Sequence, residues 1–187
     1  MSKLAPENNR EAIRLLEQAI VIAPEYGRAY AILAWCEWCQ ALGWWAADTP
    51  GTFGRALAHA ERAVALDPNE PWARVAYGMS LSTAGEHERA LGQLETMVEL
   101  NPSFALGHTF RGVALLRAGM SERAAEATAK ALRLSPIDDF SGFCNAFHGL
   151  ALMACRRFEE AIAFSRKSVA THPQFTGHWG CLTRPRR

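Results

Sequence analysis

The amino-acid sequence predicts an all-α protein, a solenoid of antiparallel helix pairs with about nine helices. Two observations lead to this prediction. First, an alanine is followed twelve residues later by a proline at five places, and the central prolines recur with the same spacing, a sign of internal repeats. Second, apolar residues between these landmarks recur at three- and four-residue intervals, the pattern of amphipathic helices. The five pairs are Ala12 and Pro24, Ala56 and Pro68, Ala90 and Pro102, Ala124 and Pro136, and Ala161 and Pro173.

The composition is that of a globular protein. Of the 187 residues, 49% are hydrophobic and 21% are charged, which excludes a disordered chain. Lys and Arg number 20 against 19 Asp and Glu, so there is no strong attraction to nucleic acid or to acidic membranes. No apolar run is long enough for a transmembrane helix, and the first ten residues lack the apolar stretch of a secretory signal. Five cysteines in helix-like, apolar segments indicate reduced thiols and a cytoplasmic location.

The repeat spacing predicts that the chain is a single array of consecutive repeats. Two repeats carry insertions, of ten residues around the sequence GWWAADTPGTFG and of three residues in IDDFSG, and we expect both in or beside connections. The two ends are incomplete repeats, which favours a fragment of a longer protein, while a short natural array with a poor cap is the open alternative. Within 1–187 the predicted segments are the second helix of a truncated repeat at 9–24, repeats at 25–68, 69–102, 103–136 and 137–173, and a truncated helix with a basic tail at 174–187.

Repeat 69–102 shows the physical logic of one unit. A first amphipathic helix ends at Gly85, because glycine adopts the left-handed conformation easily, and a second helix is stopped by Pro102. Small residues at Gly78 and Ala90 predict a close crossing of the two helices. In the next repeat, Ser121 followed by Glu122 is a start signal for the second helix.

One position breaks the pattern of the turns. Arg156 stands where the two preceding repeats have Gly85 and Gly119, so we expect a different turn there.

This 34-residue helix–turn–helix unit, with small residues at Gly78 and Ala90 and a terminal proline, resembles the tetratricopeptide repeat. The resemblance covers about residues 9–173. It implies a right-handed superhelix whose first helices line a concave groove that binds peptides. The phrases ALDPNEPWAR, ELNPSFALGH and RLSPIDD also resemble the tetratricopeptide tails of bacterial adenylate cyclases and winged-helix regulators.

Carrying the family's groove over to this chain gives an apolar surface rich in aromatic residues and methionine. Its occupant would be an amphipathic partner helix, a second copy of the chain, or the missing helices of a parent protein. The lysines, arginines and asparagines that clamp a peptide carboxylate in some relatives are nearly missing. The predicted groove residues are Arg28, Ala31, Trp35, Trp38, Trp72, Val75, Met79, Ser82, Leu106, Thr109, Val113, Leu116, Phe143, Ala146, Leu150 and Met153.

Four tryptophans, Trp35, Trp38, Trp44 and Trp45, cluster at the end of one helix and the start of the ten-residue insertion. They cover the shortened N-terminal end of the solenoid, or they form an aromatic wall of the binding groove. The sequence leaves both interpretations open.

The sequence holds no phosphate-binding glycine loop, HExxH zinc motif or GxSxG nucleophile elbow, so we predict neither catalytic residues nor a cofactor. Cys36 and Cys39 form a CxxC pair, but zinc would need two further ligands, of which His59 is the nearest candidate. We therefore predict that both cysteines are small core residues and that the chain holds no metal.

These observations predict a non-enzymatic scaffold that binds a partner protein, helix or peptide in its apolar groove. The alternative is a regulatory, sensory or oligomerisation segment of a larger bacterial signalling protein, either a cyclase or a transcription regulator. A homo-oligomer through the groove or the uncapped ends is a further expectation.

Overall fold

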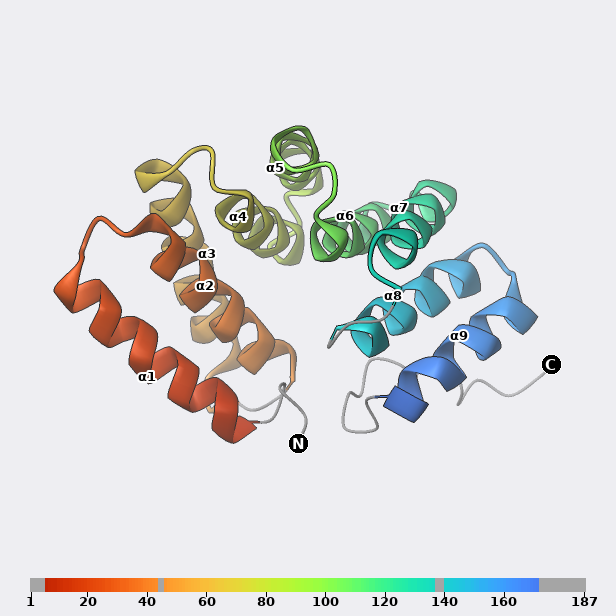
Figure 1. The fold of residues 1–187 in the computed structure, drawn as a ribbon, viewed down its shortest axis with the longest axis horizontal. Helices are drawn as coiled ribbons and strands as arrows, with labels where there is room; N and C mark the ends of the chain where they lie inside the picture. The colour runs from red at the N-terminus through yellow and green to blue at the C-terminus, as the bar shows by residue number, and fades with distance from the viewer. Residues whose placement is uncertain (1–5, 44–45, 137–139, 172–187) are drawn as a thin grey trace. The chain divides into compact units, whose positions relative to one another are not determined.

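The computed structural model describes residues 6–43, 46–136 and 140–171, and within them it contains nine helices and no strands (Figure 1). The predicted all-α class is therefore confirmed. Contacts divide the chain near Pro102 into two compact units, one holding α1 to α5 and the other α6 to α9. The helices are α1 Pro6–Ile22, α2 Gly27–Leu42, α3 Thr49–Leu66, α4 Pro71–Thr83, α5 His87–Leu100, α6 Ala105–Arg117, α7 Ser121–Leu134, α8 Ser141–Ala154 and α9 Phe158–Thr171.

Each unit is built from helix pairs joined by short connections. In the first unit, α2 pairs with α3 and α4 with α5, α3 packs on α4, and α1 packs on α2. In the second unit, α6 pairs with α7, α8 with α9, and α7 packs on α8. The pairing follows the predicted repeats, while a single continuous array across both units stays a prediction.

Small residues allow the two helices of a repeat to cross closely, as the sequence predicts. A Cβ atom added to Gly78 would lie 3.1 Å from the Ala90 carbonyl oxygen and 2.7 Å from Leu94 Cγ. The glycines at the same register in the second unit, Gly112 and Gly149, are each 3.2 Å by the same measure from the carbonyl of the alanine opposite. The backbone of the second helix thus occupies the space that a side chain would need.

The turns between paired helices correct one expectation. Gly85 and Gly119 have positive φ angles of 88° and 79°, and Arg156 has the same left-handed conformation with φ 62°. The hydrogen bonds also match, because the residue after each of these positions donates its N–H to the carbonyl five residues back, as Arg157 does to Leu152. The prediction of a different turn at Arg156 is therefore wrong, because packing of the two helices imposes the turn even on a residue with a Cβ.

The ten-residue insertion is divided between two helices and the connection that joins them. Compared with the pair α4 and α5, α2 is longer by three residues and α3 by four, and the connection between them is longer by three. Most of the insertion thus extends the helices instead of the connection. The three-residue insertion includes residues 137–139, which lie outside the described residues.

Side-chain carboxylates cap the starts of two helices. The carboxylate of Asp48 caps α3 by accepting a hydrogen bond from the Gly51 N–H at 3.0 Å, and Glu70 caps α4 through the Trp72 N–H at 3.1 Å. Helix α7 does begin at Ser121, but the residue at its N-cap is Met120, and no side chain caps it. Ser121 therefore marks the start without supplying the cap.

Candidate functional site

In the first unit, most of the predicted groove residues lie in the core. Ala31, Trp38, Val75, Met79 and Ser82 are buried. The indole N–H of Trp38 donates to the Thr83 hydroxyl at 2.9 Å, which ties α2 to the end of α4.

Three predicted groove residues of the first unit remain at the surface. Trp35 of α2 and Trp72 of α4 are half-buried and meet edge to face, with ring centroids 5.7 Å apart. Arg28 is exposed and pairs with the Glu70 carboxylate at 3.9 Å. We call Trp35, Trp72, Arg28 and Glu70 the aromatic corner. Trp44 and Trp45 lie outside the described residues.

In the second unit the predicted groove residues divide in the same way. Phe143 of α8 is buried between Phe110 of α6 and Phe147, with ring centroids 5.6 Å and 4.7 Å away. Half-buried side chains remain at Leu116, Leu150 and Met153. The other predicted residues here are buried: Leu106, Thr109, Val113 and Ala146.

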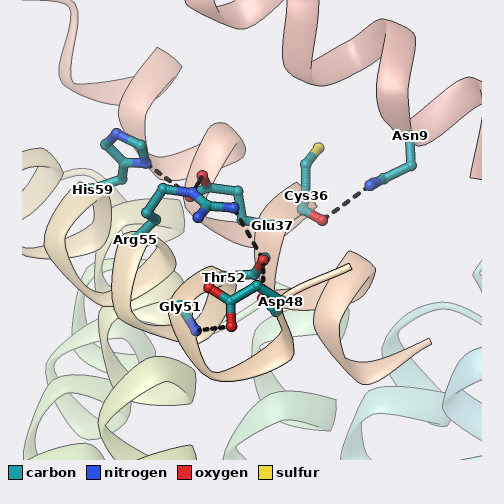
Figure 2. Close-up of polar contacts among 8 residues, drawn as sticks. All are labelled: Asn9, Cys36, Glu37, Asp48, Gly51, Thr52, Arg55 and His59. Carbon is teal, nitrogen blue, oxygen red and sulfur yellow. Dashed lines mark hydrogen bonds and ion pairs between the residues drawn. The ribbon is translucent and has the colours of Figure 1, made fainter. Parts of the chain in front are cut away.

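Sequence reasoning missed a charged cluster between α2 and α3 (Figure 2). The Glu37 side chain is buried on α2, and two polar side chains of α3 face its carboxylate. Its Oε2 accepts from Nδ1 of His59 at 2.8 Å, and its Oε1 accepts from Nε of Arg55 at 3.3 Å. A buried carboxylate is costly unless such partners face it, so the cluster fixes α2 against α3.

Further hydrogen bonds connect this cluster to the start of α3 (Figure 2). Nη2 of Arg55 donates to the Thr52 hydroxyl at 3.0 Å, and that hydroxyl donates to the Asp48 carbonyl at 2.7 Å. The spacing of Glu37 from Arg55 in sequence gave no signal for their contact. The dipeptide Asp48-Thr49 before Pro50 did carry a capping signal that could have been read.

The CxxC pair lies beside the charged cluster but does not join it. Burial, with the nearby Glu37 charge, raises the pKa of Cys36 to about 12, and burial raises that of Cys39 well above its usual value. Both thiols are therefore protonated at neutral pH, whereas zinc binds the thiolate. His59, the nearest proposed ligand, holds Glu37 instead, and the described residues contain no group of three potential metal ligands.

A second buried polar pair lies between α7 and α8. The Thr128 hydroxyl donates to the Ala124 carbonyl at 2.8 Å, so its oxygen is left to accept from Nδ1 of buried His148, also at 2.8 Å. The His148 ring packs edge-on against Phe164. Desolvation, aided by the positive charge of Arg157, lowers the His148 pKa to about 4, so the ring is neutral at pH 7.

Comparison with known families accounts for the repeat geometry. The tetratricopeptide repeat model matches residues 1–71 and 75–138, and the chain belongs to this family. Comparison with curated protein sequences found no match.

Solved structures agree with this assignment at the level of the fold. The thermophilic tetratricopeptide protein TTC0263 of Thermus thermophilus is 20% identical and matches with a TM-score of 0.73, over 95% of this chain and 92% of that chain. MamA of Desulfovibrio magneticus is 20% identical, with a TM-score of 0.58 over 90% of this chain and 88% of that one. YrrB, described as having an unusual peptide-binding site, is 16% identical, with a TM-score of 0.58 over 95% and 85%.

The family defines the general class of function. Tetratricopeptide repeats form protein–protein interaction scaffolds, and such scaffolds are generally non-enzymatic. Among the described helices, none has both the length and the apolar character required to cross a membrane.

Proposed function

We propose that this chain is a non-enzymatic scaffold that binds a helix or peptide of a partner protein on the apolar face of its first helices. The observation that carries the proposal is the aromatic corner. Two half-exposed tryptophans in edge-to-face contact, beside an ion pair, have the composition of an interface hot spot. In the second unit, the half-buried Leu116, Leu150 and Met153 supply apolar surface of the same kind.

In this proposal, the buried residues of the predicted groove stabilise the fold and do not contact the partner. Met79 is 1% exposed, so a charged residue there would disrupt the core and would not report on binding. Surface variants must therefore be taken from the aromatic corner. The buried thiols of Cys36, Cys39 and Cys144 are consistent with a cytoplasmic chain, which is part of the proposal.

The test uses helical peptides selected from a display library against the wild-type chain. Trp72→Ala should weaken binding of the selected peptides at least tenfold, because tryptophan truncation at a hot spot costs about 2 kcal/mol or more. Phe158→Ala, which removes an exposed aromatic ring from the other unit, should leave affinity unchanged. Circular dichroism checks that both variants fold. Equal affinity of Trp72→Ala and wild type would overturn the assignment of the aromatic corner.

A further inference from the structure

Arg28 is the exposed cation of the aromatic corner. Its side chain is 54% exposed, and its ion pair with Glu70 joins Nη1 to Oε2 at 3.9 Å, which is too long for a hydrogen bond. Glu70 is 14% exposed, and its Oε1 already caps α4 through the Trp72 N–H. Among the described residues, the Arg28 guanidinium therefore keeps its N–H donors available to a partner, and carboxylate is a group that this planar fork matches.

The first helices, which carry the proposed binding face, are cationic. Glu37, the one acidic residue among them, is buried and faces α3. None of these four described helices has an acidic side chain in its first turn, whereas α1, α5, α7 and α9 each do. Apart from histidine, the charged residues of α2, α4, α6 and α8 are Arg28, Glu37, Arg74, Arg111 and Arg117.

The position of Arg28 on α2 strengthens this positive charge. Arg28 lies in the first turn, where its charge adds to the positive end of the helix dipole. Asp67 lies beside the neighbouring Gly27, but its Oδ1 accepts a hydrogen bond from the Asn69 N–H at 3.0 Å. An incoming carboxylate would therefore displace no side-chain hydrogen bond from Arg28.

The two tryptophans place an apolar contact next to this cation. Arg28 and Trp35 are seven residues apart on α2, so they lie on one face at a separation of about 10 Å. Trp72 of α4 meets the Trp35 ring and follows closely after Glu70, the ion-pair partner of Arg28. A bound segment can thus cover the two rings with an apolar side chain and bring a second side chain, about one helical turn away, to Arg28.

We propose that the segment bound at the aromatic corner is acidic, with an Asp or Glu side chain that pairs with Arg28 and an apolar side chain that covers Trp35 and Trp72. This inference rests on the proposed function and names the chemistry of its partner. A chain-terminal carboxylate is a poorer occupant. Relatives that clamp a peptide terminus use several lysines, arginines and asparagines, whereas the aromatic corner has one arginine.

The test uses helical peptides selected from a display library against the wild-type chain and then synthesised with amidated C-termini. We expect Asp and Glu to be enriched over Lys and Arg about one turn from the apolar anchor residue. In fluorescence anisotropy, replacing this acid by its amide should weaken binding to the wild type about fivefold and leave binding to Arg28→Gln unchanged. Arg62→Gln, which alters an exposed arginine of α3, is the matched control and should behave like the wild type.

Charge reversal gives the complementary selection. Because Arg28 is exposed, Arg28→Glu should fold, which circular dichroism checks, and it should select peptides with Lys or Arg in place of the acid. Enrichment of Lys and Arg by the wild type would assign the corner to a basic partner and overturn the inference.

Trp72→Ala separates this inference from the proposed function. If Trp72→Ala binds the selected peptides as tightly as the wild type, the aromatic corner is not the binding site and both proposals fail. If Trp72→Ala weakens binding but the acid-to-amide change costs the same in the wild type and in Arg28→Gln, only the acidic partner is overturned.

Discussion

The two units bury polar side chains between helices by opposite electrostatic means. In the first unit, the Glu37 carboxylate forms an ion pair with Arg55 and accepts a hydrogen bond from His59. In the second unit, His148 has the Thr128 hydroxyl as its partner and is neutral, because its pKa is lowered to about 4. A helical repeat can therefore hold an ionisable side chain in its core in two ways. The charged side chain is paired with an opposite charge, or the side chain stays in its neutral form.

The difference has a consequence for the dependence of stability on pH. Burial keeps His148 neutral, so the folded chain resists protonation of this ring. The second unit should therefore lose stability in acid, and the following variants test each region separately.

The largest effect we expect is the acid sensitivity of the second unit. Unfolded histidine has a pKa of about 6.5, and folded His148 about 4. Between these values the unfolded chain binds more protons, so the stability present above pH 6.5 falls as the pH is lowered toward 4. The loss is about 3 kcal/mol by proton linkage. Urea unfolding at several pH values should show this loss in the wild type, and His148→Gln should remove it. An unchanged pH profile in His148→Gln would contradict the neutral-histidine description.

The next effect concerns the charged cluster. Arg55→Ala combined with His59→Ala leaves the buried Glu37 carboxylate without its two α3 partners and should lower the free energy of unfolding by about 2 kcal/mol. Adding Glu37→Gln should recover part of this loss, because the amide carries no charge. Arg62→Ala, an exposed arginine on the same helix, serves as the control and should have little effect. If the triple variant is no more stable than the double one, charge burial is not the cause.

The smallest effect tests the hydrogen bond that orients His148. Thr128→Val keeps the shape of the side chain but leaves the Nδ1–H of His148 without its acceptor, which should cost about 1 kcal/mol at pH 7. In a His148→Leu background the same substitution should cost close to nothing, since no donor remains. Denaturant unfolding of the four proteins gives this double-mutant cycle. Equal costs in both backgrounds would show that the hydroxyl serves the helix backbone alone.

The local features of the fold could be predicted because each depends on short-range rules. Helix periodicity, the prolines that follow second helices, and the glycines at Gly78 and Gly85 are all read within one repeat. The turn at Arg156 could not be read in this way, because the packed helices on both sides impose a conformation that arginine by itself disfavours. The ten inserted residues were expected in or beside a connection, but the sequence did not show that seven of them extend the flanking helices α2 and α3.

The candidate site residues could likewise be predicted only in part. The family resemblance, carried over by repeat register, gave Trp35 and Trp72 as groove candidates, but register alone cannot tell a groove residue from a core residue. Burial of Met79 and Trp38 depends on which neighbouring helices cover them, and that is a property of the tertiary packing.

The sequence by itself determined the helical class, the repeat period, the small residues at the helix crossings and the absence of recognisable catalytic motifs. These follow from local propensities and from spacing along the chain. Only the tertiary structure decided that Glu37 meets Arg55 and His59, and that His148 meets Thr128. The physical reason is that burial and charge pairing depend on side chains from different helices, and single-sequence periodicity carries no information about which of these side chains meet.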